Sequence, residues 1–287
     1  MEAGSTQSIK SVFCATDAWM ILLRDVYLNG AEARPRGLLT KEIVGNTSPR
    51  VDMTTPVVTS PVRRLGYRFM AAEAAWILGG KNDVASISPY SRHIASFSDD
   101  GITFAGAYGP KIVEQLDYVA ESLLNDIDTR QAVLDIWRPN PKKSKDIPCT
   151  LTVQWLVRNR HLHCLDSMRS SDVWLGWPYD TFNFAMLSAY LLLILRERNP
   201  DFRRIELGTL RITAGSSHLY LQPEADGANN IPYNHELIKL AMRKEEPRMA
   251  YRPLNLSDFR CAAELLEHLL LLKDHKATLP WLREIQK

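Results

Sequence analysis

The sequence predicts an α+β fold with one principal core. Segments with helical spacing of apolar residues and segments with alternating apolar and polar residues are both present, without the regular succession of a doubly wound fold. The 287 residues are 45% hydrophobic, and no repeat, low-complexity tract or Gly/Ser linker divides them. We therefore expect a single domain over residues 1–287, with 250–287 as a helical C-terminal extension and tail.

Five segments have the pattern of helices, and most of them end at turn-forming residues. The first, over 13–28, ends at Asn29-Gly30, and the second, over 67–78, ends at Gly79-Gly80. The others cover 111–125, the apolar run 182–195, and a Leu-rich stretch that Ser257 caps and that continues to about residue 272.

The strand signals lie mainly in the middle of the chain. They cover 132–137, 150–157, 161–168 and 205–212, and residues 31–62 have the composition of a loop followed by a strand. Residues 81–110 are polar and predict an irregular segment of the kind that carries function. We expect Gly215-Ser216-Ser217 to form a turn that opens into another helix, and residues 278–287 to form a short tail.

Composition excludes several classes of function. With 35 Lys+Arg against 33 Asp+Glu, the charges nearly cancel, so we expect no direct binding of nucleic acid or membrane, although a small phosphorylated substrate needs only a local arginine cluster. Residues 1–10 lack the apolar core of a signal peptide, and no apolar run approaches the ~20 residues of a spanning helix. We expect a soluble cytoplasmic protein.

The four cysteines are candidates for free thiols. They lack metal-ligand spacing, and His161 with His163 resembles a surface pair more than a metal site, so we expect no metal. Cys149 follows Pro148 at the start of a predicted strand, where a thiol can face a ligand, although thiols are more often buried packing groups. A neighbouring arginine would favour the nucleophilic thiolate, and Arg169, on the adjacent predicted strand, is the best candidate.

Residues 169–180 hold the densest chemistry. Arg169-Ser170 has the composition of a phosphate clamp, with a surface ion pair between Arg169 and Asp172 as the alternative. Glu73 lies in an otherwise apolar helical run, so its carboxylate either has a buried partner or is kept for a ligand. His218 and Tyr220 have the spacing to reach a sugar hydroxyl, or they form a strand-to-helix cap.

In order and spacing, these segments together resemble the thymidylate synthase superfamily. The resemblance covers roughly residues 15–222 and rests on Pro148-Cys149-Thr150, Gln154, Arg169-Ser170-Ser171-Asp172-Val173, Leu175-Gly176, His218-Leu219-Tyr220, the Glu73-to-Trp76 helix motif, Tyr108-Gly109 and Asp128-Thr129-Arg130. It implies a thymidylate synthase-like fold, in which a large mixed β-sheet is packed with helices and one sheet face forms a homodimer.

Four details resemble one branch more closely. Methylating members usually have Asn, His and Asp where this chain has Asp180, Thr150 and Ser216. Phage deoxycytidylate hydroxymethylases instead have Cys-Thr, Met-Arg-Ser-x-Asp-Val, Asp at the base-reading position and Gly-Ser-x-His-x-Tyr, and this chain has all four. An ionised carboxylate can only accept hydrogen bonds, so Asp180 suits the N4 amino group of cytosine. Opposite uracil O4, the carboxylate would leave two hydrogen-bond acceptors facing each other, which costs about 1–3 kcal/mol of binding free energy. Cytosine is then preferred over uracil by roughly tenfold or more.

The resemblance implies a covalent mechanism. Cys149 adds to C6 of the dCMP base, C5 attacks the one-carbon unit of the co-substrate methylenetetrahydrofolate, and loss of the C5 proton through water held by Tyr108 leaves an exocyclic methylene. Water then gives 5-hydroxymethyl-dCMP and tetrahydrofolate, whereas hydride transfer gives a methyl group. A dCMP C5-methyltransferase, a CMP hydroxymethylase and a catalytically silent nucleotide-binding homologue are the alternatives.

The same resemblance implies the site residues. The catalytic residues would be Cys149, Glu73, Tyr108 and Asp180. The substrate would be held by Arg36, Gln154, Arg169, Ser170, Ser171, Asp180, His218 and Tyr220, with Arg130 reaching across a dimer interface. The folate would be held by Glu73, Asp172, Leu175, Gly176 and Tyr179.

Three departures from the family pattern accompany these roles. The crossing arginine is followed by Gln131 rather than by a second arginine. Residues 80–108 hold Phe97 and Phe104 but no shielding tryptophan, which would admit water to the methylene. The tail also differs, although Trp281 or Leu282 could serve as a lid.

Overall fold

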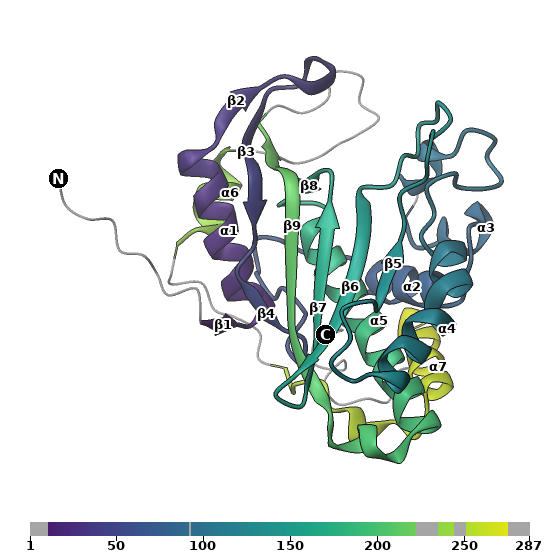
Figure 1. The fold of residues 1–287 in the computed structure, drawn as a ribbon. Helices are drawn as coiled ribbons and strands as arrows, with labels where there is room; N and C mark the ends of the chain where they lie inside the picture. Colours follow the sequence, from purple (N-terminus) through teal and green to yellow (C-terminus); the bar gives the residue numbers. More distant parts are fainter. Residues whose placement is uncertain (1–10, 92, 222–234, 244–250, 275–287) are drawn as a thin grey trace.

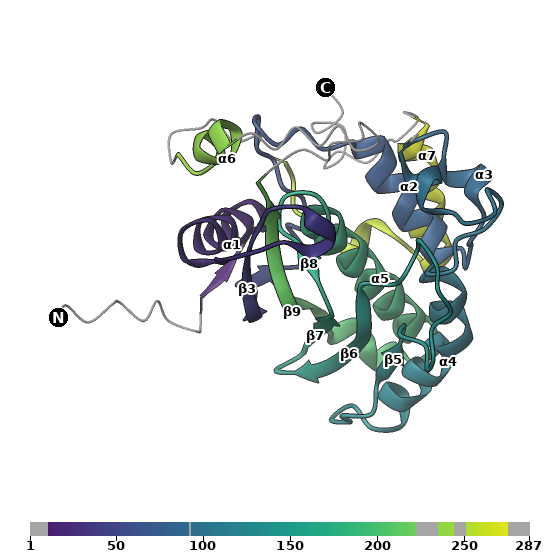
Figure 2. The ribbon, with the colours of Figure 1, turned by 90° about the horizontal axis from the view of Figure 1, so that it is seen from above.

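The structure is a computed structural model that describes residues 11–91, 93–221, 235–243 and 251–274. Within these residues, one mixed sheet of nine strands is packed with helices (Figure 1). In the view from above, most of the helices lie on one side of the curved sheet (Figure 2). The predicted α+β class with a large mixed sheet is therefore confirmed.

The longest strand, β9 (Glu206–Tyr220), lies at the centre of the sheet. It pairs antiparallel with β3 (Thr40–Thr47) and β4 (Arg50–Asp52) and parallel with β7 (His161–Met168) and β8 (Ser171–Asp172). The sheet continues from β7 through the antiparallel strands β6 (Thr150–Arg158) and β5 (Val133–Asp135), and its other side ends in β2 (Ala31–Ala33) beside β3 and β1 (Val12–Phe13) beside β4. A single strand thus joins both halves of the sheet.

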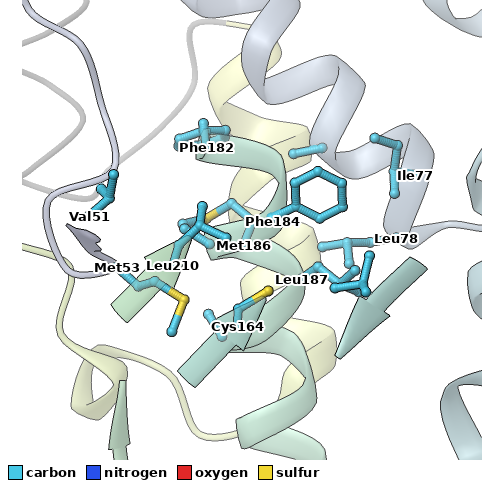
Figure 3. Close-up of a cluster of buried hydrophobic side chains, with 14 of the residues drawn as sticks. Val51, Met53, Ile77, Leu78, Cys164, Phe182, Phe184, Met186, Leu187 and Leu210 are labelled. Atoms are coloured by element: carbon cyan, nitrogen blue, oxygen red, sulfur yellow. The ribbon is translucent and has the colours of Figure 1, made fainter. Parts of the chain in front are cut away.

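Helix α5 (Trp177–Arg198) is the centre of the core. Its apolar residues face strands on one side and helix α2 (Tyr67–Leu78) on another, so most of its surface is buried. Figure 3 shows Phe184 and Leu187 of α5 between Ile77 and Leu78 of α2 and Cys164 of β7. By length and composition alone, α5 could cross a membrane, but 78% of its apolar window is buried inside the protein, as in a core helix.

The structure describes five further helices. They are α1 (Ala15–Asn29), α3 (Val84–Ile87), α4 (Gly109–Asn125), α6 (His235–Ala241) and α7 (Ala262–Lys273), with short 3₁₀ turns at Pro35–Gly37, Ile94–Phe97, Pro200–Arg204 and Leu256–Asp258. The C-terminal helix α7 packs against α2 and α5. It covers the core helix on the side away from the sheet.

The face of the sheet opposite α5 is only partly covered. Along β6 and β7, buried residues alternate with half-exposed or exposed ones, which include Gln154, Leu156, His163 and Leu165. This period of two places the apolar half of each strand on the helix side. We call the opposite side, over β5, β6, β7 and the first part of β9, the open face.

The structure corrects several predicted elements. Strand β9 begins near the predicted position but runs to Tyr220, so the turn expected at Gly215-Ser216-Ser217 is wrong. Because β9 passes close to the end of β7, a Cβ at Gly215 would lie 2.9 Å from the Arg169 carbonyl oxygen. The glycine therefore permits a close approach of two backbones rather than a turn. The helix expected directly after Tyr220 and the tail at 278–287 fall outside the described residues.

Two predicted helix starts are also wrong. Helix α5 starts at Trp177 rather than at 182, with Pro178 in its first turn. The C-terminal helix starts at Ala262, because Ser257 belongs to a 3₁₀ turn in which its amide donates to the Asn255 side chain. Residues 31–62 contain three short strands instead of one, whereas the predicted boundaries of α2 are confirmed.

Candidate active site

Cys149 lies at the edge of the sheet where β6 begins and β7 ends. Its carbonyl oxygen accepts a hydrogen bond from the Arg169 amide at 2.8 Å, and its sulfur lies 3.7 Å from Ser170 Oγ. Burial raises the pKa of the Cys149 thiol, and the charge of Arg169 opposes this rise. On balance the neutral thiol is favoured here, and Arg169 is the cation that favours the thiolate.

The guanidinium of Arg169 holds the segment that carries Cys149. It donates to the carbonyl oxygens of Pro148 and Ile147, both at 2.9 Å, and to Ser170 Oγ at 3.3 Å. The predicted proximity of Arg169 to Cys149 is confirmed. A guanidinium has five N–H donors, so this exposed group retains donors for an anion.

Tyr108 approaches Cys149 from the segment before α4. Its hydroxyl accepts a hydrogen bond from the Thr150 amide at 3.1 Å, and its ring stacks on Phe184 of α5. Burial, and then the neighbouring Cys149 and Asp180, raise the pKa of Tyr108 well above its usual value. The hydroxyl is neutral and keeps its own hydrogen for a further acceptor.

Glu73 faces α5 from the middle of α2. Asn183 Nδ2 donates to Glu73 Oε2 at 2.8 Å. Burial raises the pKa of Glu73 to about 7, although the Asn183 hydrogen bond lowers it. The carboxyl group has a buried partner, which is the first of the two alternatives from the sequence, and its near-neutral pKa suits proton exchange.

Asp180 lies in the first turn of α5, and its carboxyl group interacts with that of Glu73. Its pKa is raised well above the usual value by burial, then by Glu73 and Asp172. Asp180 in turn raises the pKa values of Tyr108 and Cys149. The two carboxyl groups influence each other, so ionising both costs more free energy than ionising one.

The turn before α5 is built on Asp172. Its Oδ1 accepts from the amides of Trp174 at 2.9 Å and Leu175 at 2.8 Å, and its carbonyl accepts from Gly176 at 3.1 Å. The Arg63 side chain also holds this turn, because its Nε donates a hydrogen bond to the Trp174 carbonyl oxygen at 2.7 Å. The predicted folate residues Asp172, Leu175 and Gly176 thus shape one turn at the start of α5.

Tyr179 forms the outer side of this turn. Its hydroxyl accepts from the Gly66 amide at 2.9 Å, and the Phe69 ring packs edge-on against it at 5.4 Å. Both contacts tie the turn to the start of α2, so the same turn is fixed between two helices.

His218 and Tyr220 lie on β9 with their rings edge to face at 5.3 Å. Arg36, in a loop before β3, donates to the Tyr220 hydroxyl at 3.0 Å and has a backbone φ of +55°. A positive φ is unfavourable for an arginine, so the loop holds this side chain at a cost in backbone strain. Ser171 belongs to β8 and pairs with Ser217 of β9. Arg36, His218 and Tyr220, three of the predicted substrate residues, therefore lie together at the end of β9.

Gln154 and Arg130 lie elsewhere. Gln154 is five residues along β6 from Cys149, roughly 16 Å at 3.3 Å per residue. Its side-chain amide donates to the Arg130 carbonyl at 2.8 Å on the open face. The structure does not bring either residue to the Cys149 of the same chain.

Four residues near the site were missed in the sequence. They are Asn183, Asp166, Glu42 and Arg63, which contact or face Glu73, Asp180, Ser216 and the turn before α5. Asn183 is three residues from Asp180 in a helical run, so its presence on the same helix face was detectable. The others depend on pairings across the sheet or between distant loops. Within the described residues, no group of three His, Cys, Asp or Glu side chains could hold a metal ion.

A thiol, an arginine and two coupled acids gathered at one edge of a sheet are typical of an enzyme that works through a cysteine nucleophile. The family model described as thymidylate synthase matches residues 17–265. The chain belongs to the thymidylate synthase family.

Named relatives belong to two groups. The chain is 29% identical over 228 residues to the deoxyuridylate hydroxymethyltransferase of Bacillus phage SP01, which covers 72% of this chain and 57% of that protein. It is 29% identical to the deoxyuridylate hydroxymethyltransferase of Pseudomonas phage M6, over 56% of this chain and 48% of that one. It is 26% identical to the thymidylate synthase of Bacillus atrophaeus, over 58% of this chain and 74% of that one. The chain thus spans about half the length of the two phage relatives.

Proposed function

We propose that this chain transfers a hydroxymethyl group to C5 of dCMP, using methylenetetrahydrofolate and water and releasing tetrahydrofolate. The observation that carries the proposal is the carboxyl group of Asp180. It interacts electrostatically with Glu73, Cys149 and Tyr108. Membership of the thymidylate synthase family supports the folate-dependent one-carbon transfer. Two relatives named as hydroxymethyltransferases support the fate of the one-carbon unit.

Asp180 favours cytosine because position 4 of this base is a hydrogen-bond donor. A carboxyl oxygen accepts from the N4 amino group whether or not the acid is ionised. Uracil presents an acceptor at position 4, so only the protonated oxygen of Asp180 can face it. We therefore propose dCMP rather than dUMP as the preferred substrate.

A second candidate is dUMP, and it has a specific basis. Both phage relatives carry the name deoxyuridylate hydroxymethyltransferase. The environment of Asp180 favours its neutral form, and a neutral acid can donate to uracil O4. The choice between the two bases thus depends on the protonation of one side chain.

The described residues support the chemical steps on the nucleotide. Cys149 adds to C6 of the ring as a thiolate that Arg169 favours. Tyr108 and Glu73 move protons at C5 and N4, because one is a neutral hydroxyl and the other has a pKa of about 7. Arg36, Arg169 and Ser170 hold the phosphate, and His218 and Tyr220 hold the sugar.

The turn before α5 fits the folate. Asp172 offers a carboxylate and Gly176 a backbone without a side chain, while Tyr179 supplies a ring held by Phe69. These groups suit a flat heterocycle with N–H donors. When bound, methylenetetrahydrofolate supplies the one-carbon unit.

The proposed enzyme is a cytoplasmic homodimer, in the host cytoplasm if a phage encodes it. The open face carries Arg130 and Gln154, away from the Cys149 of the same chain. A second copy packed on this face would place its Arg130 toward the neighbouring site. Such an arrangement explains why a phosphate-binding arginine lies so far along the sheet.

One assay tests base, sugar and product together. The protein is incubated with methylenetetrahydrofolate and 5-tritiated dCMP, CMP or dUMP, and tritium release and product mass are measured. We expect release from dCMP with a product heavier by CH₂O. A product heavier by CH₂ indicates a methyltransferase, preference for dUMP or CMP contradicts the proposed substrate, and no release from any nucleotide contradicts the proposed function.

Cys149→Ser should abolish turnover and leave nucleotide binding intact, because a hydroxyl at the same position is a far weaker nucleophile. Cys261→Ser, at a half-buried thiol outside the site, is the matched control and should retain full activity. Substantial tritium release by the Cys149 variant would rule out the covalent step.

A further inference from the structure

A line of polar contacts connects β3 to the candidate sugar site on β9. Ser216 Oγ lies 2.6 Å from Glu42 Oε2, and the same Ser216 oxygen lies 3.4 Å from Nδ1 of His218. Glu42 is the register partner of His218 across the antiparallel pair, so its carboxylate reaches Ser216 diagonally. The three side chains are half-buried.

The directions of these hydrogen bonds follow from the chemistry of the groups. A carboxylate only accepts, so the Ser216 hydroxyl donates its hydrogen to Glu42. Its oxygen can then only accept from His218. The carbonyl oxygen of Ser216, another obligatory acceptor, lies 3.5 Å from the same Nδ1. Both neighbours of Nδ1 thus require a hydrogen on that nitrogen.

We propose that Glu42 is a positioning residue that, through Ser216, holds His218 in the Nδ1–H tautomer, so that Nε2 accepts a hydrogen bond from the 3′-hydroxyl of the nucleotide sugar. This rests on the proposed function, in which His218 contacts the sugar. Without Glu42, the Ser216 hydroxyl is free to turn its hydrogen toward Nδ1, so only the Ser216 carbonyl oxygen still favours the Nδ1–H tautomer and the share of the other tautomer increases. That tautomer presents a donor instead of an acceptor at Nε2.

The surroundings of Glu42 support a role in the site rather than in sheet pairing. Its neighbour Lys41 donates to the Tyr27 carbonyl oxygen at 2.8 Å, so the nearest cation along β3 is bound to another element. On the same two strands, Thr47 and Thr213 form a cross-strand hydroxyl pair at 3.2 Å. That pair belongs to sheet pairing alone and provides a matched control.

The tautomer is measured directly by nitrogen-15 NMR of the full chain labelled at histidine, with the His218 signal assigned from His218→Asn. We expect the Nδ1–H pattern in the unmodified protein and a smaller share of this tautomer in Glu42→Ala, in which the Ser216 carbonyl oxygen is the acceptor that remains. Thr47→Ala should leave this share unchanged. An unchanged pattern in Glu42→Ala, or an Nε2–H or doubly protonated ring in the unmodified protein, would overturn the proposal.

Binding provides the second readout. Dissociation constants for dCMP and for 2′,3′-dideoxycytidine monophosphate are measured by calorimetry. Losing one hydrogen bond should weaken dCMP binding by about fivefold in Glu42→Ala. The dideoxy compound lacks the 3′-hydroxyl, so its affinity should be the same for both proteins, and Glu42→Gln should retain part of the dCMP affinity. Equal weakening for both nucleotides would indicate a purely structural role and contradict the proposal.

The two readouts separate this inference from the proposed function. The tautomer experiment uses no nucleotide, so its result does not depend on which substrate the protein takes. If the tautomer responds to Glu42 but the protein binds neither dCMP nor dUMP, the proposed function fails while the positioning of His218 by Glu42 stands. If dCMP is turned over and the tautomer does not respond, only the inference fails.

Discussion

At the scale of single residues, the proposed function makes the protonation of Asp180 decide which base the site accepts. Burial, and then Glu73 and Asp172, raise its pKa, so part of the molecules carry a neutral acid at a pH where an exposed aspartate is ionised. The neutral acid donates to uracil O4, and the ionised form does not. Both forms accept a hydrogen bond from the N4 amino group of cytosine.

It follows that selectivity for cytosine increases with pH. The ratio of kcat/KM for dCMP to that for dUMP should rise as the pH passes upward through the pKa of Asp180, by about tenfold for one opposed pair of acceptors. The amide of Asp180→Asn does not titrate, so this variant should accept dUMP at every pH and show a flat ratio. Unchanged selectivity in Asp180→Asn would show that another residue reads the base.

Glu73 gives a second pH-dependent prediction. The Asn183 hydrogen bond lowers the pKa of Glu73 from the higher value that burial alone would give, to about 7. Asn183→Leu removes this donor, so the limb of the kcat/KM profile that reports Glu73 should move to higher pH by about one unit. Asn199→Ala, at the other end of α5, should leave the limb in place. If this limb of the kcat/KM profile stays at the same pH in Asn183→Leu, it does not report the ionisation of Glu73.

The sequence was sufficient for residues whose role depends on their own chemistry and near neighbours. Arg169 lies next to Cys149 because β7 ends beside the start of β6. The alternation of apolar and polar residues predicts both strands. It was insufficient for Glu42 and Asp166, whose positions depend on partners in distant strands. An isolated acid in a strand has no local signal that it faces a site.

At the scale of elements, β7 carries an acid on its buried side. Asp166 is 1% exposed, and the Thr150 hydroxyl is the side-chain hydrogen-bonding group that lowers its pKa. Burial, and then Asp180, raise its pKa well above the usual value. Burying a carboxyl group costs free energy that one hydroxyl partner offsets only in part, so an apolar side chain of similar size should be better tolerated here.

Asp166→Leu should therefore raise the free energy of unfolding by about 1–3 kcal/mol near neutral pH. The folded chain binds a proton that the unfolded chain releases above about pH 4, so the stability of the unmodified protein falls as pH rises from there toward the folded-state pKa. The advantage of the variant should grow over the same interval. Chemical denaturation from pH 4 to pH 8 measures it, and a constant difference would mean that Asp166 is already ionised in the folded state.

Local patterns predicted elements well where one face or one stop signal dominates. The glycines after α2 mark its end, and strict alternation identifies β6 and β7. Strand β9 was cut short because Gly215 and two serines have turn composition, whereas pairing with β3 and β8 keeps the chain extended there. Tertiary pairing outweighed local propensity at this position.

At the scale of the whole molecule, the open face predicts complementation between subunits. If Arg130 serves the neighbouring site, Cys149→Ser and Arg130→Ala dimers are both impaired, but a mixed dimer contains one intact site. Exchange of subunits in an equal mixture should restore roughly a quarter of normal activity, since half of the dimers are mixed and each has one of two sites intact. Turnover after mixing measures this.

Arg36 provides the matched control for that experiment. It contacts Tyr220 of its own chain, so under the proposed function an Arg36→Ala subunit lacks this phosphate contact whatever its partner is. Mixing Arg36→Ala with Cys149→Ser should restore nothing. Recovery in both mixtures, or in neither, would show that Arg130 does not cross between subunits.

The central position of β9 also sets the order in which the molecule is assembled. Its partners β3 and β4 lie more than 150 residues earlier in the chain, so both wait for a late segment during synthesis. Contacts between such distant segments form slowly, because a long loop must close before any pairing compensates for the lost chain entropy. Arg36, His218 and Tyr220 come together only with that pairing. A nascent chain halted before residue 206 therefore has Cys149 but not the strand that carries His218 and Tyr220, and under the proposed function it should not hold the nucleotide sugar.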